Sequence, residues 1–178
     1  MLSKNYVVFI RFIAYLAPQL RLSIMRRIAM LVGYRKPHQI GPEDMTAPQA
    51  KITTFLMFEG AAEEAMTFYM SLFDRSKVVN IDRYGPGEPG KEGSVRHAIF
   101  ELGGQPFMCI DSPVSHGFTF TPAISLYVSC ADEPEIDRLA AALADRGQVL
   151  MPLAAYPFSK KFTWLQDRFG VSWQLSLR

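Results

Sequence analysis

Short runs of apolar and polar residues alternate after residue 50, and their spacing predicts an ordered series of strands and helices. Residues 52–58 form an apolar, β-prone run. Residues 61–73 place apolar side chains at helical spacing, with two acidic residues in the first turns, where they favour the helix dipole. Three further strands are predicted over residues 76–84, 95–102 and 106–110. The last two are joined by a Gly-Gly pair, a hairpin signal.

The same order of elements repeats after a loop over residues 112–122. The second set is a strand over residues 123–130, a helix over 132–146, strands over 149–153, 161–165 and 171–177, and a loop over 154–159. Asp132 is a suitable N-cap for the helix, and Gly147 ends it. Neither unit buries enough apolar surface alone, so we expect their sheets to pair, with helices on one face and a cleft on the other.

The first fifty residues differ in charge from the rest of the chain. Seven basic and two acidic residues precede Met45, whereas twelve basic and fifteen acidic residues follow it. We therefore predict a basic, partly helical N-terminal extension and linker over residues 1–50, followed by a slightly acidic domain over residues 51–178. No stripe of Lys and Arg interleaved with aromatic residues follows Met45, so nucleic-acid binding is not expected.

The extension bears on localisation. Residues 6–17 are apolar but contain Arg11, which makes a membrane-spanning helix unfavourable. Residues 19–32 have apolar residues at helical spacing with arginines between them, so residues 5–32 are a candidate for peripheral contact with an anionic membrane. The alternative is that residues 1–44 are a tail without function. Both cysteines lie in apolar runs without metal-like spacing, which predicts buried thiols and a cytoplasmic location.

Three segments resemble the PhnB-like branch of the vicinal oxygen chelate superfamily, often labelled 3-demethylubiquinone-9 3-methyltransferase. They are Ile52–Gly60, Ala62–Tyr69 and Phe162–Gln174. The resemblance covers residues 51–178 and implies an α+β fold of tandem βαβββ modules, at about residues 51–111 and 122–178. These form a cup-shaped mixed sheet of the glyoxalase/bleomycin resistance/dihydroxybiphenyl dioxygenase kind. It also implies a homodimer that completes or shields the cups.

Two functions that the resemblance suggests, methyl transfer and metal binding, can be checked against residues of the sequence. Gly85–Gly90 matches the G-x-G-x-x-G pattern of nucleotide-binding turns, but two prolines and no following helix predict a hairpin loop, so methyl transfer is not expected. Metal-using relatives place ligands at positions that correspond to Thr53, a residue near Met108, Ala123 and Gln174. Only Gln174 retains a ligand type used by those relatives. We therefore expect no cofactor and no tight metal site. Binding of a weakly held divalent ion is the alternative.

Strand alternation then selects candidate side chains for the cleft. His97 is a candidate for proton transfer, with Asp111 or Glu101 to set its tautomer, although a half-buried, hydrogen-bonded histidine is the simpler interpretation. Asp167 is assigned to the turn over residues 166–170, and Trp173 to the core. The candidates for ligand binding are Thr53, Phe55, Met57, Cys109, Ser125, Tyr127, Trp164 and Gln174.

The leading functional prediction is a domain that binds a small hydrophobic or planar molecule and, as the resemblance implies, forms a homodimer. The alternative is an enzyme of the same superfamily that uses His97 in proton transfer, and a third is a partner-binding module held at a membrane by the extension. The sequence identifies neither the ligand nor the oligomeric state, and it leaves open whether a reaction is catalysed.

Overall fold

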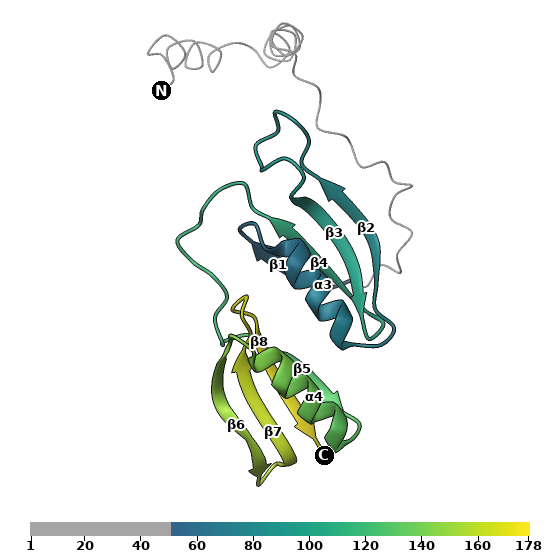
Figure 1. Cartoon of the computed structure of the whole chain (residues 1–178), viewed down its shortest axis with the longest axis vertical. Helices are drawn as coiled ribbons and strands as arrows, with labels where there is room; N and C mark the ends of the chain where they lie inside the picture. The colour runs from purple at the N-terminus through teal and green to yellow at the C-terminus, as the bar shows by residue number, and fades with distance from the viewer. Residues whose placement is uncertain (1–50) are drawn as a thin grey trace, which may run out of the picture. The chain divides into compact units, whose positions relative to one another are not determined.

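The computed structural model describes residues 51–178 (Figure 1), so the predicted extension and its membrane-contacting segment lie outside the described residues. The described part contains two βαβββ modules, as predicted. The first consists of β1 (Thr54–Phe58), α3 (Ala62–Leu72), β2 (Lys77–Arg83), β3 (Val95–Leu102) and β4 (Gln105–Asp111). The second consists of β5 (Leu126–Cys130), α4 (Glu133–Ala144), β6 (Gln148–Tyr156), β7 (Ser159–Gln166) and β8 (Ser172–Leu177). The α+β class and the internal repeat are confirmed.

Each module folds its four strands into one mixed sheet with the same topology. The strand orders are β1-β4-β3-β2 and β5-β8-β7-β6, and the first strand of each module pairs in parallel with its last. All strand pairings of residues 51–178 fall within one sheet or the other. The half-sheets, which the sequence predicted to pair, are therefore two separate sheets within this chain. The strands β1 and β5 are each left at a sheet edge.

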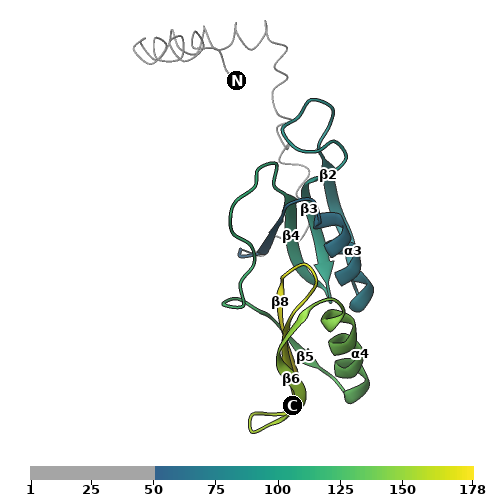
Figure 2. The same cartoon turned by 60° about the vertical axis from the view of Figure 1, so that its left-hand side comes forward.

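A helix covers one face of each sheet, which leaves the opposite face without helical cover from residues 51–178 (Figure 2). The inner side of α3 is fully buried at Ala62, Ala65 and Tyr69, and the inner side of α4 at Ile136, Leu139 and Leu143. Burying one such large apolar side chain contributes about 1.5–3 kcal/mol. The sheet residues that complete this core include Leu56, Phe58, Ala98, Phe100, Phe107, Cys109, Leu165, Trp173 and Leu175. We call the uncovered side of each sheet its open face.

The start of α4 is capped as predicted. The Asp132 carboxylate accepts a hydrogen bond from the backbone N–H of Glu135 at 2.9 Å, and Pro134 stands in the first turn, where its missing N–H costs nothing. Among the described helices, none has both the length and the apolar character needed to cross a bilayer.

The hairpin of β6 and β7 is longer than predicted. The sequence predicted a loop over residues 154–159, but β6 continues to Tyr156 and β7 begins at Ser159. Aromatic packing extends the ladder, because the Tyr156 ring stacks on Phe158 at 5.6 Å and meets Phe162 edge-on at 5.9 Å between ring centroids. The Ser159 hydroxyl also bonds across the sheet to Ser176 at 2.9 Å. The two aromatic contacts lie within the hairpin itself, and the serine pair ties the start of β7 to β8.

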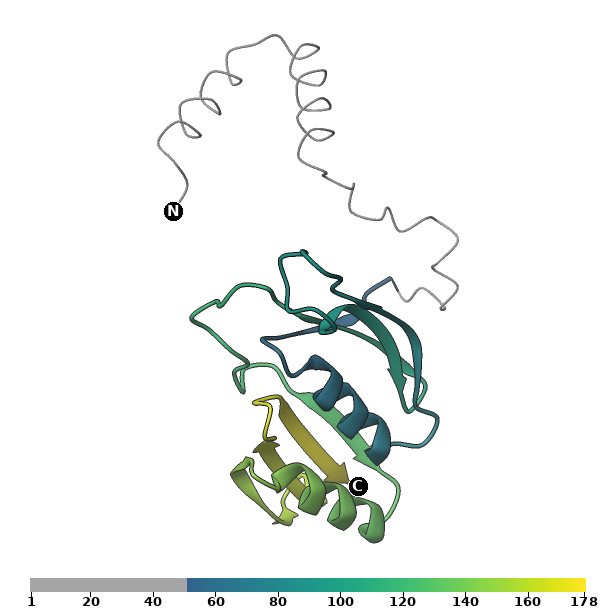
Figure 3. The same ribbon diagram turned by 45° about the horizontal axis from the view of Figure 1, so that its top comes forward.

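The modules contact each other through α3 and the turn between β7 and β8 (Figure 3). The Tyr69 hydroxyl of α3 donates to the Asp167 carboxylate at 2.7 Å, and its ring meets Trp173 at 5.2 Å. Asp167 also accepts from the backbone N–H of Phe169 at 2.8 Å, which confirms its predicted place in the turn. Trp173 is buried, as predicted. Asp167 therefore has a second role that the sequence did not reveal, since it links the two modules.

Candidate functional site

The open face of the second sheet carries a connected set of polar side chains. The Ser172 hydroxyl accepts a hydrogen bond from the Trp164 indole N–H at 2.9 Å and shares another with the Ser125 hydroxyl at 2.7 Å. The Gln174 amide N–H reaches the Ser125 oxygen at 3.3 Å. We call Ser125, Trp164, Ser172 and Gln174 the polar set. Three of these four were predicted ligand-binding residues, and the structure brings them together.

Tyr127 lies beside the polar set, since the register pairs it with Gln174. Its side chain is 51% exposed, and its hydroxyl has no hydrogen-bond partner among residues 51–178. The amide oxygen of Gln174 likewise has no hydrogen-bond partner among residues 51–178. The face therefore presents an exposed aromatic ring next to polar groups that still have capacity for a hydrogen bond.

The open face of the first sheet is apolar over much of its area. The register aligns Phe55 of β1 with Met108 of β4, and Met108 with Ile99 of β3. Met57 follows two residues after Phe55 on the same face, and Thr53 immediately precedes β1. Phe55 is 50% exposed, which is high for a phenylalanine in a sheet. This face offers apolar surface but few directional groups.

His97 lies on β3, directly across from Asp82 of β2. Burial lowers the pKa of the His97 imidazole, and the nearby Asp82 charge opposes that change in part. No hydrogen bond joins its ring to another of the described residues. A lowered pKa leaves the ring neutral at pH 7, the form in which a histidine accepts a proton.

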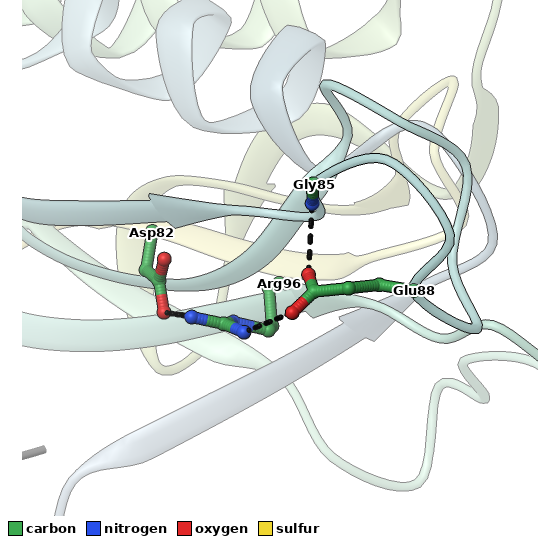
Figure 4. Close-up of polar contacts among 4 residues, drawn as sticks. All are labelled: Asp82, Gly85, Glu88 and Arg96. Atoms are coloured by element: carbon green, nitrogen blue, oxygen red, sulfur yellow. Dashed lines mark hydrogen bonds and ion pairs between the residues drawn. The ribbon is translucent and has the colours of Figure 1, made fainter. Parts of the chain in front are cut away.

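The carboxylate across from His97 is already engaged. Arg96 donates to Asp82 through Nε at 2.8 Å and to Glu88 through Nη1 at 2.9 Å, and the other Glu88 oxygen accepts from the Gly85 N–H at 2.8 Å (Figure 4). These bonds brace the loop between β2 and β3. Asp82 is therefore held by Arg96 in an arrangement that stabilises the loop.

Neither predicted partner of His97 lies next to it. Glu101 is four residues further along the same strand, about 13 Å away at the usual rise per residue, and pairs with Lys77 at 3.5 Å. The Asp111 carboxylate faces the helix side, where it accepts from the backbone N–H groups of Gly60 at 2.8 Å and Ala62 at 2.9 Å. It thereby caps the start of α3, which has no cap of its own.

Cys109 also lies on the helix side of the first sheet, which corrects its predicted placement together with that of Asp111. The sequence rightly placed the two on one side of β4, but that side is buried: Cys109 pairs with Leu56 and Ala98, both core residues. Burial raises the pKa of the Cys109 thiol to about 12 and that of Cys130 to about 11. Both thiols are thus protonated, and neither has the properties of a nucleophile.

A groove of about 670 Å³ lies beside the linker that joins the modules, which is residues 112–125 between β4 and β5. Its walls include Phe55 and Met57 of β1, Phe118 and Phe120 of the linker, and Arg168 and Phe169 of the turn after β7. We call it the linker groove. A neighbouring cavity of about 480 Å³ shares Phe55 and Phe120 with it and reaches Ser172 of the polar set. Sequence reasoning missed Arg168 and the linker residues, for which the only signal was the aromatic pair within a predicted loop.

The cofactor implied by the methyltransferase label does not fit the loop that matches G-x-G-x-x-G. Gly85–Gly90 lies in the connection between the antiparallel strands β2 and β3, as predicted, whereas nucleotide-binding turns join a strand to a helix. Across residues 51–178, no three His, Cys, Asp or Glu side chains converge as a metal site of those ligands requires. Gln174, the one retained ligand type, donates its amide N–H to Ser125.

Comparison with known proteins gives a consistent result. A family model described as 3-demethylubiquinone-9 3-methyltransferase matches residues 50–176. Among solved structures, the chain is 66% identical to a PhnB protein from Bacillus cereus, with a TM-score of 0.71 over 72% of this chain and 100% of that one. A protein from Pseudomonas aeruginosa is 27% identical, with a TM-score of 0.64 over 73% and 98% of the two chains. No curated protein matches the chain. Because the family model spans most of its length, the chain belongs to the PhnB-like family that carries the 3-demethylubiquinone-9 3-methyltransferase description.

Proposed function

We propose that the chain binds a small hydrophobic or planar molecule at the open face of the second sheet. The polar set supports this proposal most directly, because its hydrogen bonds fix the orientation of Trp164 and Gln174 before any ligand arrives. Small-molecule sites combine apolar and aromatic walls with a few fixed polar groups. Here the exposed ring of Tyr127 supplies the aromatic surface, and its hydroxyl and the Gln174 amide oxygen supply the directional groups.

The binding unit we propose is a homodimer. Residues 51–178 leave one face of each sheet without helical cover, and large apolar side chains stand exposed near the edges β1 and β5, such as Ile52 and Ile124. A second copy is the partner best able to shelter such surface, since exposed apolar patches and unpaired edges favour association. Light scattering coupled to size-exclusion chromatography should then give about twice the 20.1 kDa mass of one chain. A monomer at micromolar concentration would contradict this part of the proposal.

Binding can be tested with N-phenyl-1-naphthylamine, an uncharged aromatic fluorophore, and the purified full chain. We expect Tyr127→Ala to weaken its binding about tenfold, as loss of an aromatic contact of 1–1.5 kcal/mol implies. The matched control is Val149→Ala, which truncates a side chain of equal 50% exposure on the edge strand β6 and should leave affinity unchanged. Mass spectrometry of the native protein would identify any co-purified molecule. Equal affinities for wild type and Tyr127→Ala would refute the proposed site.

An enzymatic function is a second candidate, supported by the neutral imidazole of His97, which forms no hydrogen bond with the other described residues, on the open face of the first sheet. His97→Ala separates the two functions once a ligand is identified. A binding protein should keep its affinity within about twofold, whereas an enzyme should lose turnover by about 10²–10⁴-fold. We do not assign methyl transfer, because the glycine-rich loop lacks the strand-to-helix geometry of a nucleotide site.

A further inference from the structure

We infer that the linker groove binds the aromatic body of a monoanionic ligand whose negative group lies against Arg168. This inference rests on the proposed function and adds the location of the apolar part and the charge of the ligand. The groove volume of about 670 Å³ is in the range that suits a single drug-sized molecule.

The walls of the groove are unusually rich in phenylalanine. Phe58 packs at the base, with its ring centroid 5.2 Å from Phe120 and 6.4 Å from Phe169. Phe55 and Phe118 stand at the rim, 50% and 68% exposed. Exposing two aromatic rings at the mouth of one groove leaves apolar surface in water, which an aromatic ligand would remove.

Arg168 supplies the charge complementarity. Its side chain is 18% exposed, and the guanidinium carbon lies 3.9 Å from the centroid of the Phe68 ring, which holds the group in place. Its Nη1 reaches Asp145 only at 3.4 Å, and its Nε is buried without a hydrogen-bond partner among residues 51–178. A guanidinium carries five N–H donors, and most of those of Arg168 have no partner in the described part of the chain. Such a cation next to an apolar groove favours a carboxylate or sulfonate group.

Glu59 sets a limit on the charge of the ligand, because it lines the same groove. Its two carboxylate oxygens accept from the backbone N–H of His116 at 2.8 Å and from the Ser115 hydroxyl at 3.0 Å. The group therefore stays ionised and repels a second anionic group near it. The ligand should therefore carry one negative charge next to Arg168 and no negative charge near Glu59.

The test uses two probes that differ in one anionic group: 8-anilinonaphthalene-1-sulfonate and its uncharged parent N-phenyl-1-naphthylamine. We expect Arg168→Met to weaken binding of the sulfonate about tenfold, as loss of a charge-assisted hydrogen bond implies, and binding of the neutral probe less than twofold. The matched control is Arg146→Met, because Arg146 also contacts Asp145 at 3.4 Å but is 67% exposed and does not line the groove. It should change neither affinity.

A second variant keeps the test valid if Arg168→Met folds poorly. Phe118→Ser alters an exposed linker side chain and should weaken both probes about fivefold, as loss of an aromatic contact of about 1 kcal/mol implies. Its control is Phe158→Ser, another exposed phenylalanine, which lies in the β6–β7 turn.

Equal losses of both probes in Arg168→Met would overturn the anionic part of the inference, and unchanged binding in Phe118→Ser would overturn the groove itself. If the neutral probe remains sensitive to Tyr127→Ala in either case, the proposed function still stands. If neither probe binds the wild-type protein, both proposals fail.

Discussion

Removal of one hydroxyl group tests how the two modules hold together. Tyr69→Phe deletes the hydrogen bond from α3 to the Asp167 carboxylate, at 2.7 Å, and keeps the ring that packs on Trp173. The same Asp167 oxygen still accepts from the Trp173 indole N–H at 2.8 Å, and the other oxygen accepts from the backbone N–H groups of Phe169 and Val171. The substitution therefore removes one contact between the modules without opening a large cavity.

The expected cost follows from the burial of this bond. Tyr69 is fully buried and Asp167 is nearly so, and a hydrogen bond to a charged group contributes about 1.5–3 kcal/mol to stability. At roughly 4 °C per kcal/mol for a domain of this size, Tm should fall by about 6–12 °C. The matched control is Tyr156→Phe, which removes an exposed hydrogen bond of 3.0 Å to the Pro152 carbonyl and should cost about 0.5 kcal/mol or less.

Urea denaturation of the full chain, followed by tryptophan fluorescence, measures both variants on one scale. Trp173 lies beside the altered residue, so its emission reports the contact directly. A loss for Tyr69→Phe no larger than that for Tyr156→Phe would refute the assignment of Asp167 as the link between the modules.

The dependence of stability on pH gives a second measure of the same contact. Burial, and then the charge of Asp167, raise the pKa of Tyr69 above its ordinary value of 10.0. The unfolded chain loses this proton near pH 10 and the folded chain retains it, so the stabilisation is complete below pH 10 and declines as pH rises above it. Tyr69→Phe should lack this part of the alkaline decline. An identical decline in both proteins would contradict the reasoning.

Three other predictions concern the linker, a turn and the thiols. Hydrogen bonding to the His116 N–H lowers the pKa of Glu59 below 4.5, so the linker should loosen as pH falls below that value. Glu59→Gln should speed hydrogen exchange of the His116 amide at pH 7. The control Glu64→Gln, in the exposed first turn of α3, should leave that exchange rate unchanged. Gly147→Ala should lower the free energy of unfolding by about 1–3 kcal/mol in urea titrations, because the new methyl group would collide with the Gln166 carbonyl oxygen. An unchanged free energy of unfolding would show that Gly147 does not lie so close to this oxygen. Both cysteines should resist iodoacetamide at pH 8 until the chain is unfolded, and rapid labelling of the native protein would show that the thiols are accessible.

Periodicity predicted the order of elements well because most strands bury one face. Ala98, Phe100 and Leu102 were placed under a helix, and all three are buried there. The same reasoning failed on β4, where Phe107 and Cys109 alternate with Met108 and Ile110. Both sides of that strand are apolar, so alternation groups the residues correctly but does not tell which group faces the helix.

The candidate site was predictable only where it lies on regular strands. Ser125, Trp164 and Gln174 come from different segments of the second module, and all three lie on the open face of its sheet. Pairing of the strands then connects them by hydrogen bonds, in part through Ser172. The position of Arg168 depends instead on a turn that packs against a helix about one hundred residues earlier in the chain. No local pattern encodes such a contact, which is why the linker groove became visible only in the structure.

The two modules share a topology but differ in the chemistry of their open faces. The open face of the first sheet is largely apolar and carries His97, whereas that of the second carries the polar set with its fixed hydrogen bonds. Because the linker groove and its neighbouring cavity share Phe55 and Phe120, the apolar wall of the first module adjoins the polar set of the second. A ligand with one apolar end and one polar end can therefore use both modules at once, which neither module offers by itself. The repeat provides two copies of one scaffold, and the difference between their open faces would orient a molecule bound as we propose.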